Sequence, residues 1–278
     1  MEIIDIDSNQ ESSSSTAEFN KPLLEKEDYE KINVMVCTPC YGGKMDQATV
    51  SGMIGTAVTA LSSGIKLDFR FLSNDSLITR ARNNLVAQFL ASDEHTHLFF
   101  LDADIQFNPN SLLRLCVSDR MVSVGAYPTK SMPPRYVIDF KEDSTVDDLK
   151  FIEVERAGTG FMCIKRECLE SMKESYPNLK YKSELETKGY SQEALDSLGE
   201  EVIEKIKKNT YSFFDTSIHD EGGNYLSEDY TFCERWKKIG GSIWLDTGSK
   251  LDHVGTATYA LGVEDFDSMF KDKKVDKE

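Results

Sequence analysis

The sequence predicts an α/β fold in which a mainly parallel β-sheet is flanked by helices. Apolar runs of strand length alternate with longer amphipathic segments in a βαβαβ order, and glycine or polar residues separate them. With 40% hydrophobic residues over 278 positions, the chain can bury one large core or two modest ones. Because crossover helices cover both faces of a parallel sheet, ligands bind beyond the carboxyl ends of its strands.

The expected elements of the first half are strand 32–39, helix 45–64, strand 66–74, helix 76–94 and strand 97–102. The first and last strands, INVMVCTP and HLFFLD, are nearly uninterrupted apolar runs, as in strands buried on both faces. Gly64 ends the first helix. In the second helix, Ile78, Ala81, Leu85 and Phe89 recur at the spacing of one helix face.

The second half is less regular. Its expected strands lie within residues 121–130, 135–140, 149–165 and 242–248, and its expected helices lie in 166–173 and 227–241, with Ser227 as an N-cap. Residues 175–209 are charged and predict a helical insertion or a lid. Residues 1–30 are serine-rich and acidic, so we expect a disordered tail. One catalytic domain over 31–261 and a charged tail over 262–278 complete the expected organisation.

The net charge of −16 argues against a nucleic-acid partner, because a phosphate backbone would be repelled. No apolar run reaches the roughly 18 residues of a membrane span, and the first 30 residues lack the apolar core of a signal peptide. Six scattered cysteines are too few for a disulfide scaffold and are expected to be reduced. These features predict a soluble, cytoplasmic protein.

Asp102 and Asp104 stand one residue apart, directly after the apolar run LFFL. Residues i and i+2 of an extended segment point the same way, so two carboxylates converge on one cation. Mg²⁺ or Mn²⁺ prefers such oxygen ligands, shared with substrate phosphates. The alternative is that two acids end a strand and begin a turn. Their place after a buried strand favours a metal site for a nucleotide diphosphate.

The chain resembles the GT-A glycosyltransferases over residues 32–259, most clearly in SLITRARNNL, LFFLDADIQFNP, AGTGFMCIKRE, LSEDYTFCERWKKIGG and LDHVG. The run LITRARN…LFFLDADI is also similar to fungal Golgi α-mannosyltransferases. The resemblance implies a Rossmann-like GT-A sheet with a smaller, mixed acceptor-side region. It also implies that the D-x-D of Asp102, Ala103 and Asp104 binds a divalent metal and the phosphates of a nucleotide-diphosphate sugar.

Arg80 lies in the first turn of its helix, where a cation opposes the positive helix end and needs a nearby anion. A donor diphosphate or the carboxylate of Asp75 would supply that anion, and the position favours neither. Asn84 shares the face of Arg80. Asp75, Arg80 and Asn84 are therefore candidate donor-binding residues, whereas Arg82 points elsewhere and is expected at the surface or the sheet edge.

Thr38, Pro39 and Tyr41 lie at the end of the first strand, where the resemblance places the base and ribose of the donor. Cys37 and Cys40 in the same stretch match C-x-P-C, the spacing of thioredoxin-like redox sites. A redox site would begin a helix directly after the second cysteine. Here Tyr41 and two glycines intervene as a loop, which favours donor binding.

Glu228 and Asp229 begin a helix, where acids stabilise the helix dipole. In GT-A enzymes an E-D pair at this place in the chain reaches the acceptor, and in inverting members the aspartate takes the proton of the attacking hydroxyl. The resemblance therefore implies Asp229 as the general base, with Glu228 as its substitute. The E-D pair favours inversion, and the likeness to retaining mannosyltransferases opposes it.

His253, in LDHVG, is either a packing residue or, as the resemblance implies, a further metal ligand beside Asp102 and Asp104. An imidazole ligand suits Mn²⁺ better than Mg²⁺. Gly160, in GTGF, either lets the backbone approach a sugar or belongs to a plain hairpin turn.

Together these features predict a metal-dependent glycosyltransferase that uses Mn²⁺ or Mg²⁺ and a nucleotide-diphosphate sugar, with a glycan, protein or small-molecule acceptor. Two rivals stay open: a nucleotidyltransferase that makes nucleotide sugars, and a non-catalytic carbohydrate-binding module on the same scaffold. The donor sugar, the acceptor and the oligomeric state are left open.

Overall fold

The computed structural model describes residues 26–187, 198–219, 222–255 and 258–260. Within these residues, eight strands form the main sheet in the order β2 (Lys66–Ser73), β1 (Asn33–Cys40), β3 (His97–Leu101), β8 (Phe161–Lys165), β5 (Val122–Gly125), β11 (Ile243–Asp246), β7 (Phe151–Ala157) and β6 (Ile138–Phe140). The pairs β2–β1, β1–β3 and β5–β11 are parallel. Only β8 and β7 run against the others, which confirms the predicted mainly parallel sheet.

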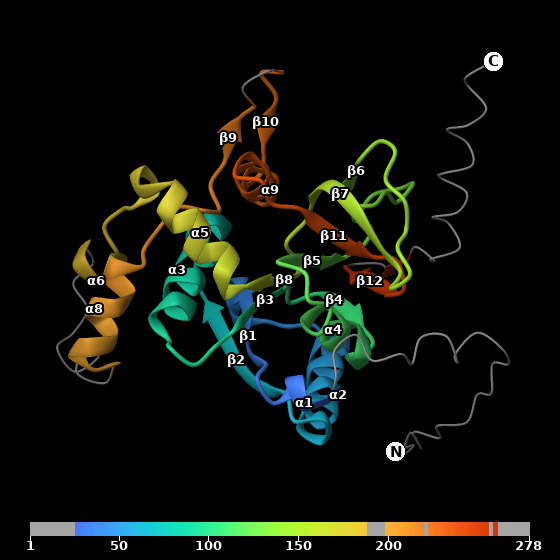
Figure 1. Ribbon diagram of the computed structural model, residues 1–278, viewed down its shortest axis with the longest axis horizontal. Helices are drawn as coiled ribbons and strands as arrows, with labels where there is room; N and C mark the ends of the chain where they lie inside the picture. Colours follow the sequence, from blue (N-terminus) through green and yellow to red (C-terminus); the bar gives the residue numbers. More distant parts are fainter. Residues whose placement is uncertain (1–25, 188–197, 220–221, 256–257, 261–278) are drawn as a thin grey trace, which may run out of the picture.

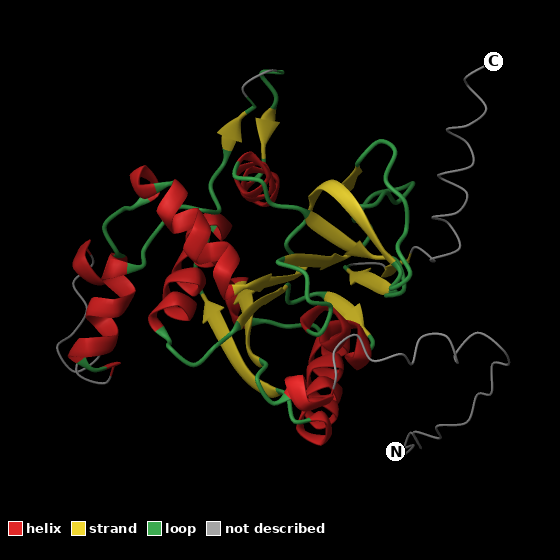
Figure 2. Cartoon of the chain, in the orientation of Figure 1, coloured by secondary structure: helices red, strands yellow, loops and turns green. Residues whose placement is uncertain are grey.

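Helices cover both faces of this sheet (Figures 1 and 2). One face packs against α2 (Gln47–Ser63) and α4 (Pro109–Cys116), and the other against α3 (Ile78–Ala91), α5 (Arg166–Ser175) and α9 (Glu228–Lys238). Strand β3 shows how the sequence separates the two cores. Leu98 and Phe100 belong to the α3 side and Phe99 and Leu101 to the α2 side, because successive side chains of a strand point to opposite faces.

The predicted end of the first helix at Gly64 is confirmed, and the helix begins at Gln47, two residues later than expected. Asp46 caps the amino end of α2 by accepting a bond from the Ala48 amide, and Gly64 ends the helix in the left-handed conformation (φ 84°). At α4, Asn108 is the N-cap and Pro109 takes the first helical position, where its missing N–H is not needed.

Two smaller sheets lie beside the main one. Strands β13 (Thr258–Ala260), β12 (Leu251–Val254) and β4 (Ile105–Phe107) form the first, and β9 (Ser217–Ile218) and β10 (Tyr225–Leu226) form the second. Because β12 pairs with β4, the segment that follows the D-x-D lies against residues almost 150 positions later in the chain. This pairing supplies one wall of the candidate site.

The described part of the segment 175–209 contains three helices joined by irregular stretches. It contains η3 (Pro177–Leu179), α6 (Glu184–Thr187) and α8 (Glu200–Lys208). Ile206 of α8 packs on Ala87 and Ala91 of α3, and Lys205 pairs with Asp93. The segment therefore rests against the outer side of α3, and its residues 188–197 lie outside the described part.

The expected amino-terminal tail lies outside the described residues up to position 25, and the expected tail 262–278 lies wholly outside them. Residues Lys26–Tyr29 form the short helix α1, and Tyr29 packs against the core of the α2 side. Within the described residues, regular structure is therefore already present before residue 31.

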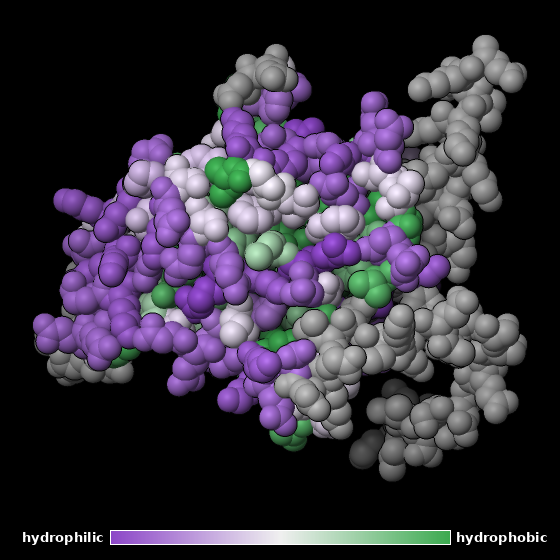
Figure 3. Space-filling view, viewed as in Figure 1, coloured by the Kyte–Doolittle hydropathy of each residue, from purple (hydrophilic) through white to green (hydrophobic). Residues whose placement is uncertain are grey.

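The face shown in Figure 3 is mainly hydrophilic, as expected for a chain with a net charge of −16. Among the described helices, none combines the length and apolar character that crossing a membrane requires. The six cysteines are free thiols and all are buried.

Candidate functional site

A cleft of about 730 Å³ opens at the carboxyl ends of β1 and β3. It lies where ligands are expected in an α/β sheet. The loop after β1, the starts of α3 and α9, and the loops after β3 and β5 all contribute to it. Its polar lining residues are Tyr41, Lys44, Asp46, Arg82, Asp102, Asp104, Tyr127, Lys130, Glu228 and Asp229.

Asp104 and His253 are brought together by the β4–β12 ladder, in which His253 pairs with Ile105 and the Val254 amide bonds the Asp104 carbonyl. His253 Nε2 lies 3.4 Å from Asp104 Oδ1. His253 Nδ1 lies 2.9 Å from the Pro128 carbonyl oxygen, which can only accept, so Nδ1 carries a hydrogen. In the neutral ring, the Nε2 lone pair then faces a carboxylate, an arrangement that calls for a cation or a proton between them.

Lys130, which no sequence pattern singled out, also contacts this pair. Its ammonium group bonds Asp104 Oδ2 from the loop that follows β5. Burial alone would raise the pKa of Asp104, but the hydrogen bonds from His253 and Lys130 outweigh burial, and the pKa lies below its ordinary value. Asp104 is therefore a charged carboxylate with the Lys130 ammonium beside it.

Asp102 has different hydrogen-bond partners from Asp104. Its Oδ1 accepts a bond from Arg82 Nη2 at 3.0 Å, and its amide bonds the Gly160 carbonyl at 2.9 Å. Within the described residues no group of three or more His, Cys, Asp or Glu side chains is placed to hold a metal ion. Of the three expected metal ligands, the structure thus joins Asp104 and His253 and holds Asp102 apart.

Gly160 lies directly beside Asp102. A Cβ added to Gly160 would lie 2.8 Å from Asp102 Oδ2 and 2.8 Å from the Tyr127 ring, and the Gly160 amide donates to the Tyr127 hydroxyl at 3.0 Å. The hairpin alternative is wrong, because β11 and β5 stand between β7 and β8 in the sheet. Because Gly160 has no side chain, its backbone can lie against the Asp102 carboxylate.

The prediction that Arg82 lies at the surface or the sheet edge is wrong. Its side chain is 4% exposed, and its guanidinium pairs with Asp102 and, through Nε at 3.4 Å, with Glu228. The signal was present in the sequence: Arg82 precedes Leu85 by three and Phe89 by seven residues, the spacing of the buried helix face. The prediction followed the usual surface position of arginine instead of this spacing.

Arg80, Asp75 and Asn84 lie together, but none of them lines the cleft. Arg80 forms ion pairs with Asp75 at 2.6 Å and with Glu184 at 3.2 Å, and Asn84 donates to Glu184 at 3.4 Å. The ion-pair alternative therefore accounts for Arg80, and these residues anchor α6 to α3. The described part of the segment 175–209 likewise contributes no lining residue, so a lid role for it stays a prediction.

The stretch after β1 divides between the cleft and the core. Pro39 and Tyr41 line the cleft, and Tyr41 is 76% exposed, whereas Thr38 is fully buried within β1. The redox alternative is wrong, because Cys37 and Cys40 both belong to β1 and the next α-helix begins only at Gln47. Burial raises the pKa of both thiols, which keeps them protonated.

Glu228 and Asp229 start α9, as predicted, and both line the cleft, but their surroundings differ. Glu228 bonds Arg82, and burial raises its pKa although the Arg82 charge opposes that shift. Asp229 Oδ1 accepts from the Ser227 hydroxyl and from the Tyr230 amide. Among the described residues, no hydrogen bond engages Asp229 Oδ2, so this oxygen is open to a ligand. Ser227 is the N-cap residue, although its hydroxyl binds Asp229 instead of capping the helix.

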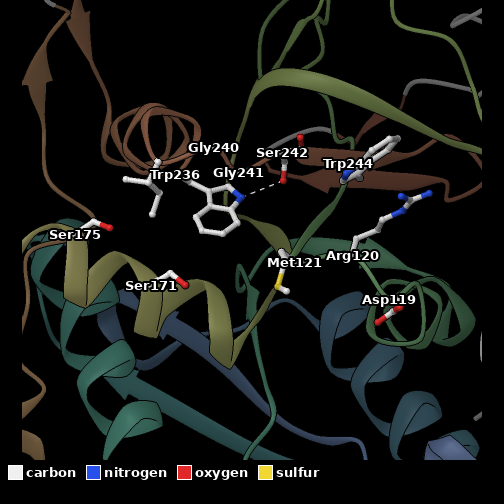
Figure 4. A pocket seen from close by; sticks show the side chains of 11 residues that line it. Asp119, Arg120, Met121, Ser171, Ser175, Trp236, Gly240, Gly241, Ser242 and Trp244 are labelled. Carbon is white, nitrogen blue, oxygen red and sulfur yellow. Dashed lines mark hydrogen bonds between the residues drawn. The ribbon is translucent and has the colours of Figure 1, made fainter.

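A separate hollow of about 440 Å³ lies at the other end of β5 and β11 (Figure 4). Met121 and Trp236 are among its lining residues, and the Arg120 guanidinium lies over the Trp244 ring at 4.0 Å from its centre. It contains none of the predicted site residues. The candidate chemistry therefore belongs to the cleft at the carboxyl ends of the strands.

No protein-family model and no curated protein matches this chain. Solved structures that it resembles include A197 from STIV, with a TM-score of 0.45 and 17% identity over 81% of this chain and 86% of that one. A putative glucose-1-phosphate thymidylyltransferase from Bacillus anthracis has a TM-score of 0.32 and 8% identity over 75% and 94%. A glycosyltransferase involved in glycosylation of the major capsid of PBCV-1 has a TM-score of 0.27 and 11% identity over 74% and 98%. These are weak likenesses, and the fold class rests on the sheet itself.

Proposed function

We propose that this chain is a metal-dependent glycosyltransferase that moves a sugar from a nucleotide-diphosphate sugar to an acceptor hydroxyl. The observation that carries the proposal is that one cleft is lined by both Asp104, whose Oδ1 lies 3.4 Å from His253 Nε2, and Asp229, a carboxylate with an open oxygen. The two groups match the two requirements of the reaction, a counter-charge for the leaving diphosphate and a base for the acceptor.

Asp104 and His253 fit a divalent cation. A carboxylate oxygen and an imidazole nitrogen both bind Mn²⁺, and the bond from His253 Nδ1 to the Pro128 carbonyl is the kind that fixes a metal-binding histidine. When bound, Mn²⁺ or Mg²⁺ would offset the charge of the leaving diphosphate. Lys130 and Lys44 add positive charge to the same cleft.

On the donor side, Pro39 and Tyr41 would contact the base and ribose, and Asp102 would accept a hydrogen bond from a donor hydroxyl. The Ala103 backbone lies between the two aspartates. On the acceptor side, Asp229 would accept the proton of the attacking hydroxyl at Oδ2, since Oδ1 is already hydrogen-bonded. The acceptor oxygen then bonds the anomeric carbon as the bond from that carbon to the diphosphate oxygen breaks. Glu228 is less suited as a base because it bonds Arg82.

The test is a panel of UDP-glucose, UDP-N-acetylglucosamine and GDP-mannose, each with and without Mn²⁺. We expect at least one of them to raise the thermal unfolding temperature only when Mn²⁺ is present, and to be hydrolysed slowly. Chelation with EDTA should abolish both effects. A panel in which Mn²⁺ changes neither binding nor hydrolysis would contradict the proposal.

A nucleotidyltransferase that makes nucleotide sugars is the second candidate, favoured by the loop after β1. Tyr41–Gly43 form a single helical turn in which Gly42 and Gly43 have positive φ, and Lys44 follows it into the cleft. A basic glycine loop of this kind suits a triphosphate. Release of pyrophosphate from a nucleoside triphosphate and a sugar 1-phosphate distinguishes this activity from hydrolysis of a nucleotide sugar.

The proposal includes a cytoplasmic location and a glycan, protein or small-molecule acceptor. The location is supported by the six buried free thiols, which suit a reducing compartment. The carbohydrate-binding module is the less favoured rival, because sugar binding alone needs neither the Asp104–His253 pair nor an open carboxylate at Asp229.

A further inference from the structure

Arg82 lies between the donor half and the acceptor half of the cleft. Its Nη2 donates to Asp102 Oδ1 at 3.0 Å, and its Nε donates to Glu228 Oε1 at 3.4 Å. These carboxylates lie at the end of β3 and at the start of α9, 126 positions apart. One buried side chain thus joins the two segments that carry the proposed donor and acceptor groups.

The surroundings of Arg82 make this arrangement specific to arginine. The guanidinium lies 5.2 Å from the centre of the Phe100 ring, and among the described residues its Nη1 has no hydrogen-bond partner. A buried cation needs opposite charges close by, and here Asp102 and Glu228 supply them. A planar fork reaches two carboxylates from one position, whereas the single ammonium of lysine reaches one.

This pairing gives the two aspartates of the D-x-D different surroundings. Arg82 already offsets the charge of Asp102, and Gly160 leaves room for Oδ2 to lie against the backbone. A carboxylate so neutralised attracts a second cation weakly, but its remaining lone pairs still accept hydrogen bonds from hydroxyl groups. Asp104, in contrast, faces His253 and the exchangeable ammonium of Lys130.

We propose that Arg82 is a positioning residue that reserves Asp102 for a hydroxyl group of the bound donor and holds Glu228 so that α9 presents Asp229 to the cleft. This inference rests on the proposed glycosyltransferase function. It assigns cation binding to Asp104 and His253, and it assigns to Arg82 an effect on turnover that is separate from metal binding.

The test uses Arg82→Lys and the isosteric Asp102→Asn, with Arg114→Lys as the matched control. Arg114 also pairs with a buried aspartate, Asp246, at 2.9 Å, and it lies outside the cleft. Hydrolysis of whichever of UDP-glucose and GDP-mannose the wild type turns over is measured against donor and Mn²⁺ concentration. Thermal unfolding monitored by circular dichroism shows that each variant is folded.

We expect Arg82→Lys to lower kcat at least tenfold, with the half-saturating Mn²⁺ concentration within about twofold of the wild type, and Arg114→Lys to leave both nearly unchanged. If Arg82 acts through Asp102 and Glu228, the triple variant Arg82→Lys/Asp102→Asn/Glu228→Gln is no more than about threefold slower than the double variant Asp102→Asn/Glu228→Gln. Losses in kcat that multiply, or an Mn²⁺ requirement raised as much as in Asp104→Asn, overturn the inference.

If Arg82→Lys fails to fold, the half-saturating Mn²⁺ concentration of Asp102→Asn is the deciding measurement. An unchanged concentration supports the assignment of the cation to Asp104 and of a donor hydroxyl to Asp102, and a raised concentration overturns it. A wild type that hydrolyses neither donor is a different result, which rejects the proposed function and with it the inference.

Discussion

Asp102 and Asp104 are two positions apart, yet their side chains have different partners. Asp102 belongs to the ion-pair cluster of Arg82 and Glu228, and Asp104 belongs to the cluster of His253 and Lys130. The expectation that i and i+2 carboxylates converge holds for a straight strand, but β3 ends at Leu101 and the chain turns before β4 begins at Ile105. The turn lets the two residues take separate roles.

Lys130 and a divalent cation compete for the same carboxylate. In Lys130→Met, Asp104 Oδ2 loses its ammonium partner, so Mn²⁺ no longer has to displace it. Because a partly exposed ion pair contributes about 0.2–1 kcal/mol, we expect Mn²⁺ to bind up to about fivefold more tightly. Electron paramagnetic resonance of free Mn²⁺ measures this directly. Lys130→Arg, which keeps the charge, should stay near the wild type, and weaker Mn²⁺ binding by Lys130→Met would contradict competition.

Asp229→Asn tests the base. The substitution keeps the shape of the side chain but removes the basic oxygen, so turnover to acceptor should fall roughly a hundredfold to ten-thousandfold while donor affinity stays within about threefold. Glu228→Gln, next to it, should have a smaller effect, because Glu228 bonds Arg82. Kinetics beside NMR of the product anomer provide the measurement. A loss below about tenfold, or a product with retained configuration, would remove the base assignment.

At the scale of elements, the sequence predicted what repeats locally and missed what depends on pairing between distant segments. The βαβαβ order, the Gly64 helix end and the D-x-D after β3 were readable because each has a local pattern. Lys130 was not, since it comes from an irregular loop that approaches Asp104 only when the chain is folded. Arg82 was misread because helix periodicity placed it on the buried face while its residue type suggested solvent.

Strand β3 also carries a buried histidine whose titration affects stability. His97 is 7% exposed, its Nδ1 lies 2.8 Å from the Thr96 hydroxyl, and its Nε2 has no partner among the described residues. Burial, followed by the positive charge of Lys165, lowers the pKa of His97 from 6.5 to about 4. As pH falls below 6.5 the unfolded chain takes up a proton that the folded chain refuses, so this stabilisation is present above pH 6.5 and is lost towards pH 4.

We therefore expect His97 to account for a loss of about 2 kcal/mol in the free energy of unfolding between pH 7 and pH 4.5. Urea denaturation at both pH values measures it, with His97→Asn as the comparison because asparagine stays neutral throughout. The difference between wild type and variant isolates this group from the carboxylates that titrate in the same range. Equal losses in both proteins would show that His97 does not resist protonation in the folded state.

At the scale of the whole molecule, a strand from late in the sequence completes the middle of the main sheet. Strand β11, from residues 243–246, lies between β5 and β7, which were both placed much earlier in the sequence. The cleft likewise joins the loop after β1 to α9 and β12. Neither the first half nor the second half can complete the sheet or the site alone.

This topology predicts that the described core unfolds as one unit, although the chain is longer than the roughly 150 residues below which two-state behaviour is usual. The two tryptophans, Trp236 in α9 and Trp244 in β11, report on the late segments, whereas circular dichroism at 222 nm has a large contribution from α2 and α3. We expect the fluorescence and dichroism transitions in urea to coincide, because losing β11 separates β5 from β7 and removes Ile243 and Leu245 from the core on the α3 side. The single-tryptophan variants Trp236→Phe and Trp244→Phe provide the control for each probe. A fluorescence transition that precedes the dichroism transition would show that α9 and β11 detach while the parallel half of the sheet, β2–β1–β3, stays folded by itself.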